Sequence, residues 1–294
     1  MHAIWLAILL SLGGAARALA DEAGTNAPAN NVLAEAGWPV GEKLTYRIYW
    51  GYLPVGTAVA TVDWADYRGR RVLAIKFSTV SNKAIEKLYP VDDSIESLVD
   101  PSTFLPLQFT KNLSEGSHRH YEVTTFDRTN RVANWESKLS GRKKTFTIGA
   151  RTQDIPSFMY AMRTSRFAVG QREHYQVMAD EKLYDLWINV TGAETLDAPP
   201  FGKVKTLKAE PEAAFQGLFV RSGKIWIWIS DDKRCLAAKI EGSVPVASIR
   251  AVLVNVEGPG TDRWIPNPKA GETNAPVARP PERSAPYPPA APVP

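Results

Sequence analysis

His118 and His120 are the residues of this chain whose spacing best suits metal binding. Two residues apart on a strand, their side chains point to the same face, so both imidazoles can reach one ion. Glu115 and Glu122 are near in sequence, but two histidines alone do not make a site. An exposed polar strand face explains the pattern more simply, and the sequence predicts no metal site.

Acid–base or nucleophilic chemistry has similarly weak support. Asp92-Asp93 and Asp231-Asp232 are acidic pairs, but adjacent strand residues point to opposite faces and both pairs adjoin turns. Ser157 has neither a Gly-x-Ser-x-Gly elbow nor an identifiable histidine partner. We therefore predict no catalytic residues and no cofactor. A hydrolase or metal enzyme is the least favoured function.

Apolar residues are the stronger binding candidates. Gly56, Ala58 and Ala60 fall on one face of an expected strand, where small side chains permit close approach of another element or leave room for a ligand. Trp226 and Trp228 lie opposite three isoleucines, so both faces of their strand are apolar. Such a strand is covered on its outer face, or its inner face lines a cavity. These five residues are the predicted ligand-binding residues, and plain core packing is the alternative.

The elements that position them are short alternating segments over residues 41–257. Leu44, Tyr46, Ile48 and Trp50 fall on one face of the first segment, which indicates a strand with one buried face. The pattern predicts a mainly β domain, with a large antiparallel sheet curled into a barrel or half-barrel. Turn residues separate the expected strands, which cover 43–51, 55–64, 71–80, 93–99, 105–113, 118–127, 131–139, 143–149, 172–179, 182–190, 203–210, 215–221, 224–230, 235–241 and 246–256.

One short helix is expected over residues 155–167. Asp154 can accept from the free amides at its start, and Pro156 suits a first turn. Residues 82–89 fit a single helical turn. Apolar side chains of the longer helix would cover one end of the sheet, namely those of Phe158, Met159, Met162 and Phe167.

The two ends of the chain differ from the domain. Residues 1–20 resemble a secretory signal, with a short apolar core and a small-x-small sequence ending at Ala20, although a membrane anchor is the alternative. Residues 21–40 are an expected flexible leader. Residues 258–294 hold 11 of the 22 prolines and are an expected disordered tail. We expect a periplasmic or secreted protein that is soluble after signal cleavage.

Charge and cysteine content narrow the possible partners. The net charge of +4 is spread along the chain without a basic stripe, so we predict no nucleic-acid binding. Arg70-Arg71 and Arg142-Lys143-Lys144 adjoin glycines and are expected at exposed hairpin tips, for solubility or weak attraction to an anionic envelope surface. The single cysteine, Cys235, cannot form an internal disulfide.

Three segments together resemble an exported bacterial family, the domain of unknown function 3108. They are Gly41–Trp50 with Val55–Ala58, Asp154–Ser157 with Tyr160–Arg163 and Gly170, and Ile227–Asp232 with Lys239-Ile240. Arg234-Cys235-Leu236 departs from the resemblance, which implies a proline-containing turn there. The resemblance implies an envelope protein dominated by antiparallel strands, and it transfers no catalytic residue.

The leading hypothesis is a non-enzymatic protein of the cell envelope that binds a lipid or another apolar molecule. The likeness of such a barrel to periplasmic lipoprotein carriers is an analogy of fold. The alternative is a structural or interaction protein whose barrel is filled by its own side chains, with an envelope protein as partner. The sequence does not indicate the oligomeric state.

Overall fold

The computed structural model describes residues 39–213, 224–244, 247–259, 261 and 264. The expected signal segment, nearly all of the leader, the expected strand 215–221 and the chain after Trp264 lie outside the described residues.

A single sheet of 14 antiparallel strands dominates the described chain, which confirms the predicted fold class. The sheet has two arms, one formed by the first eight strands (β1–β8) and the other by the last six (β9–β14), and consecutive strands pair within each arm. β1 pairs with β14 and so joins the two arms. The sheet curls without closing, because β8 and β9 form its two edges. The strands are β1 Lys43–Trp50, β2 Leu53–Tyr67, β3 Arg70–Ser81, β4 Asp92–Val99, β5 Pro106–Glu115, β6 His118–Asp127, β7 Val132–Ser137, β8 Lys143–Thr147, β9 Arg172–Ala179, β10 Lys182–Asp197, β11 Lys203–Ala213, β12 Ile225–Ser230, β13 Ala237–Val244 and β14 Ala247–Glu257.

Side chains alternate between the two faces of each strand, and the apolar ones point to the inner face of the curled sheet. Leu44, Tyr46 and Ile48 of β1 are buried, whereas Trp50 is exposed at the end of the strand. Most expected strands are present with shifted ends. β13 begins two residues later than expected because Cys235 has a φ of 46°, which belongs to a turn and not to a strand.

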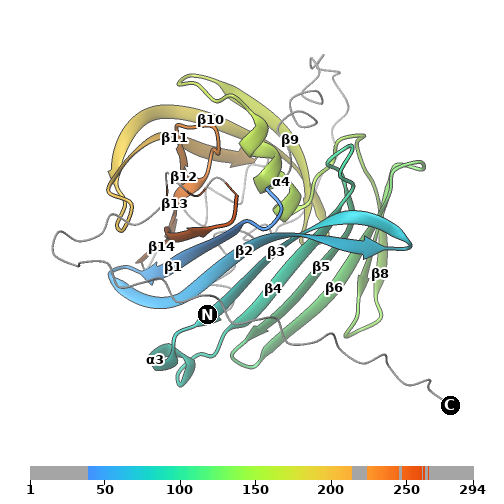
Figure 1. Cartoon of the computed structure of the whole chain (residues 1–294). Coiled ribbons are helices and arrows are strands. Elements are labelled where there is room, and N and C mark those ends of the chain that lie inside the picture. The colour runs from blue at the N-terminus through green and yellow to red at the C-terminus, as the bar shows by residue number, and fades with distance from the viewer. Residues whose placement is uncertain (1–38, 214–223, 245–246, 260, 262–263, 265–294) are drawn as a thin grey trace, which may run out of the picture.

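The longer helix lies inside the curl. α4 covers Ile155–Ala161 and is followed by a 3₁₀ turn at Met162–Thr164, so it is shorter than the expected 155–167. The helix ends there because Ser165 has an extended backbone. α4 packs against β3, β4 and β9, and thus touches both arms of the sheet (Figure 1). A second helix, α3 at Lys83–Glu86, is the expected single turn.

The chain just before α4 attaches to the edge strand β9. Gln153 N–H donates to Gln176 O at 2.8 Å, and Met178 N–H donates to Gln153 O at 2.8 Å. Asp154 then caps the helix by accepting from Ser157 N–H at 2.9 Å. The helix is therefore held at its start by one arm and covered by the other.

Trp264 lies in the range expected to be tail, yet its indole is 1% exposed. The ring packs edge-on against Phe201, with centroids 5.1 Å apart. The first residues after β14 thus contribute an aromatic side chain to the core.

Candidate functional site

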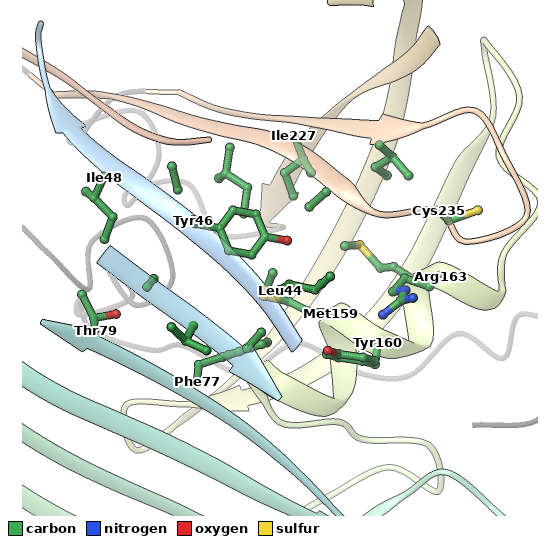
Figure 2. A pocket seen from close by; sticks show the side chains of 18 residues that line it. Leu44, Tyr46, Ile48, Phe77, Thr79, Met159, Tyr160, Arg163, Ile227 and Cys235 are labelled. Carbon is green, nitrogen blue, oxygen red and sulfur yellow. The ribbon is translucent and has the colours of Figure 1, made fainter. Parts of the chain in front are cut away.

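A cavity of about 90 Å³ lies on the inner side of the sheet, between β1–β3, the α4–3₁₀ segment and β12–β14 (Figure 2). Its walls are mostly aliphatic and aromatic, with Leu44 and Phe77 on one side and Ile227 and Ile229 on another. Such a concave, largely apolar space with a few polar groups is typical of a small-molecule site.

Small residues opposite large ones create this space. Ala58 pairs with Tyr46 on β1 and with Thr79 on β3. Ala60 pairs in the same way with Leu44 and Phe77. On the far wall, Ala251 of β14 lies opposite Ile48 and Ile240. A methyl group at each of these positions leaves volume that a larger side chain would fill.

The predicted small residues therefore separate into two roles. Ala58 and Ala60 both line the cavity. Gly56 does not, and a Cβ atom added there would lie 2.5 Å from the carbonyl oxygen of Val80. Gly56 thus permits the close approach of β3, which is the other role that its small size suggested.

Trp226 and Trp228 lie on the face of β12 away from the cavity. Lys239 Nζ lies 4.0 Å from the ring centroid of Trp228, and the indole N–H donates to Glu194 Oε1 at 2.6 Å. Lys208 Nζ lies 5.5 Å from the Trp226 ring. Lysine and glutamate side chains thus cover the outer face, while Ile227 and Ile229 of the same strand line the cavity.

A buried cluster of charges adjoins the cavity at Arg163, and the sequence did not indicate it. Glu42, with a fully buried side chain, receives Arg163 Nη1–H at Oε1 (2.6 Å) and Nη2–H at Oε2 (3.0 Å). Arg234 also donates to Oε2, and the Tyr160 hydroxyl donates to Oε1 at 3.2 Å. Arg163 Nε–H donates to Arg234 O at 3.0 Å. The cluster joins the start of β1, the 3₁₀ turn and the β12–β13 turn.

Electrostatics keep Glu42 ionised in this setting. Burial alone would raise its pKa, but the guanidinium groups of Arg163 and Arg234 hold the pKa below its usual value. The same carboxylate raises the pKa of Arg163, against the effect of burial. All three residues lie within or beside the segments that carry the family resemblance, but no short motif spans them, since Glu42 and Arg163 are 121 residues apart.

Tyr46, Thr79 and Cys235 are further polar side chains in the cavity wall. Tyr46 is 8% exposed, and burial raises its pKa, as does the charge of Glu42. Cys235 is partly buried, and burial together with Asp232 raises the pKa of its thiol. A thiol with a raised pKa is mostly protonated at neutral pH and is a weak nucleophile.

The histidine pair lies elsewhere, on β6. The rings of His118 and His120 stack with centroids 6.5 Å apart, and His120 Nε2 lies 2.6 Å from Glu122 Oε2. Glu122 also accepts from the Trp135 indole at 2.8 Å. Within the described part of the chain, no three His, Cys, Asp or Glu side chains are grouped to hold a metal ion.

The acidic pairs and Ser157 have structural partners. Asp93 is buried and accepts from Ser114 N–H at 2.8 Å, whereas Asp92 is exposed on the opposite face. Asp232 caps its turn by accepting from Arg234 N–H at 2.9 Å. Ser157 Oγ accepts from Asp154 N–H at 3.0 Å, which completes the capping box of α4.

The basic segment Arg142-Lys143-Lys144, expected at an exposed hairpin tip, forms ion pairs with one carboxylate. Arg142 Nη2–H donates to Glu181 Oε2 at 3.0 Å, and Lys144 donates to the same carboxylate. Glu181 lies in the turn between β9 and β10. These ion pairs connect the two edges of the curled sheet.

Comparison with known proteins supports the family and the fold. The sequence model of DUF3108, a family of proteins of unknown function, matches residues 45–254. No curated protein matches the sequence. A β-barrel-like protein of the domain of unknown function DUF1849 from Brucella abortus superposes with a TM-score of 0.51 at 9% identity, over 74% of this chain and 97% of that chain. A candidate lipoprotein from Parabacteroides distasonis reaches a TM-score of 0.28 at 9% identity, over 74% and 95% of the two chains.

Proposed function

The chain belongs to the DUF3108 family of proteins of unknown function, and we propose that it is a non-enzymatic protein of the cell envelope that binds a lipid or another apolar molecule. The observation that carries this proposal is the apolar cavity between β1–β3 and β12–β14. Burial of an apolar group in such a space contributes about 0.8 kcal/mol per CH₂. An unfilled cavity of this kind otherwise costs stability.

The size of the cavity limits what it encloses. At about 90 Å³ it is smaller than the roughly 150 Å³ cavity that holds a benzene molecule. Met159 and Met162 form part of its wall. Methionine is unbranched and adapts its shape easily, so these side chains can admit a longer alkyl group by changing rotamer. We infer a ligand with a slender alkyl chain.

The location is proposed from the sequence. Residues 1–20 have the apolar core and the small-residue pattern of a secretory signal. In the described ranges, no helix is long and apolar enough to cross a membrane. The signal-like segment supports a protein that is exported and acts in the periplasm or outside the cell.

Ala58→Phe tests the proposal directly, because a phenyl group at this position projects into the cavity. We expect the variant to lose uptake of a fluorescent fatty acid that the wild type binds. Thr57→Phe is the matched control, since Thr57 pairs with the exposed residues Arg47 and Val80 on the other face of β2. The control should keep wild-type uptake.

Stability separates this function from the alternative of a self-filled structural barrel. Strands β4–β8 support that alternative, because Phe109, Phe126 and Trp135 fill the inner face of this part of the sheet. If the space around Ala58 is available, a buried phenyl group should leave the free energy of unfolding unchanged or raise it, by up to about 3 kcal/mol. In a filled core the same change costs about 1–3 kcal/mol. A destabilised variant and a wild type without uptake would favour the structural barrel.

A further inference from the structure

The charged hydrogen-bond donor of the cavity, Arg163, lies on one side of a wall that is mostly apolar. Figure 2 shows the Tyr46 hydroxyl directed into the cavity, toward the side on which Arg163 lies. The wall near Ile227 is aliphatic, and on the side of Ile48 the hydroxyl of Thr79 adds one polar group. The space is therefore amphipathic, and its polar groups indicate the chemistry of the ligand's head.

Tyr46 has an unused hydroxyl. The residue is more than nine-tenths buried, and its surroundings act on the hydroxyl through burial and the charges of Arg163 and Glu42, with no hydrogen bond to a described residue. A buried phenol normally finds a partner, because leaving a buried polar group unsatisfied costs about 1–3 kcal/mol. Ala58 lies directly across from Tyr46 on β2, so the space beside the ring is open to a ligand.

Arg163 also has hydrogen-bonding capacity left. A guanidinium group has five N–H donors, and three of the Arg163 donors are used by Glu42 and by Arg234 O. Glu42 already accepts from Arg163, Arg234 and Tyr160. The polar side of the cavity thus offers donors, whereas its carboxylate is occupied.

We propose that the ligand is an amphipathic molecule whose alkyl chain lies in the cavity and whose anionic oxygen group accepts hydrogen bonds from the Tyr46 hydroxyl and the Arg163 guanidinium. This inference rests on the proposed function and specifies its ligand class. A carboxylate or a phosphate monoester provides the required acceptors. A cationic head would place a like charge beside Arg163 and would leave the phenol without its charged acceptor.

Three probes with the same alkyl chain test the head group: octanoate, octyl phosphate and octylammonium. Their affinities are measured by calorimetric titration of the full-length mature protein at neutral pH. We expect at least one of the two anions to bind about tenfold or more tightly than octylammonium. The better anion distinguishes a fatty-acid carboxylate from a phosphate head.

Tyr46→Phe removes only the hydroxyl and should lower the affinity for the preferred anion about 5- to 20-fold. Its effect on octylammonium should be less than about twofold. Tyr184→Phe is the matched control, because Tyr184 is a buried tyrosine whose hydroxyl has no partner within the described structure and which does not line this cavity. Arg163→Lys keeps the positive charge at the Glu42 site and should reduce the anion preference.

The outcomes separate the inference from the proposed function. Equal binding of the anions and octylammonium, or an unchanged preference in Tyr46→Phe, would overturn the head-group inference while apolar binding stands. If none of the three probes binds wild-type protein, and the fluorescent fatty acid is not taken up either, both proposals fail.

Discussion

Glu42 is the residue on which the interior electrostatics depend. Its buried carboxylate is the common partner of Arg163, Arg234 and Tyr160. Arg163 in turn belongs to the cavity wall. One carboxylate therefore connects the start of the sheet, the end of the helical segment and the β12–β13 turn, and it fixes the orientation of the guanidinium that we assign to the ligand's head.

Glu42→Gln should destabilise the protein strongly, because it leaves two largely buried guanidinium groups without their carboxylate. Removal of one partner from a buried ion pair costs about 3–5 kcal/mol. Denaturant unfolding measures the change. Glu257→Gln is the control, since Glu257 is half exposed and pairs with Lys43 at 2.9 Å; there we expect a change below about 1 kcal/mol. Equal losses in the free energy of unfolding for the two substitutions would show that the buried Glu42 cluster stabilises the fold no more than an exposed ion pair does.

Single charged residues of this kind could not be assigned from the sequence. Glu42 lies next to an expected strand, where a charge is ordinary, and Arg234 lies in a turn. Their contact depends on the pairing of β1 with β14 and on the shape of the β12–β13 turn, which no local pattern specifies. By contrast, Ala58 and Ala60 were identifiable because size and alternation are local properties of one strand.

At the scale of elements, α4 combines a strong cap with a buried acid. Asp154 is completely buried and accepts from Ser97 Oγ at 2.6 Å and from Ser157 N–H at 2.9 Å. Burial raises the pKa of Asp154 to about 6, against the hydrogen bonds from these serines and the charge of Arg128. The capping pattern and the start of the helix were predicted from Asp154 and Pro156. The early end was not, because it depends on the backbone of Ser165.

This pKa makes stability depend on pH. The folded state binds the Asp154 proton more tightly than the unfolded state, whose pKa is near 4. The free energy of unfolding therefore falls as the pH rises from about 4 to about 6, by about 2–3 kcal/mol from this group. Burial also raises the pKa of Asp93 to about 6, and its contribution has the same sign.

Asp154→Asn should flatten this dependence, because asparagine retains a capping oxygen and does not titrate. Chemical unfolding at several pH values between about 4 and 7 measures the slope. Asp63→Asn, at an exposed position of β2, is the control and should keep the wild-type pH dependence of the free energy of unfolding. An unchanged slope in Asp154→Asn would contradict the assignment.

At the scale of the whole molecule, side chains rather than a ladder connect the edges of the sheet. The two-residue turn between β9 and β10 consists of Asp180 and Glu181, both with positive φ. Asp180 pairs with Lys111 of β5 at 2.5 Å, and Glu181 pairs with Arg142 and Lys144 near β8. The alternating pattern predicted the antiparallel sheet, but it could not show whether the sheet closes, since closure depends on accumulated twist.

Lys111→Met should loosen this connection. Lys111 is buried, and its loss leaves the mostly buried Asp180 carboxylate without a cation. We expect a loss of about 2–3 kcal/mol and faster hydrogen exchange of the β9 amides. Lys138→Met breaks a more exposed pair with Glu136. This control should change both the free energy of unfolding and the hydrogen exchange of β9 much less. Unaltered exchange in β9 would mean that the arms are held together without this pair.

The central claim is that the cavity beside Ala58 holds an apolar or amphipathic ligand. Native mass spectrometry of the protein purified from the cells that make it tests this most directly, with Ala58→Phe purified in parallel. We predict one small apolar or amphipathic molecule per wild-type chain, absent from the variant. Bare chains in both preparations, or the same adduct in both, would contradict the claim.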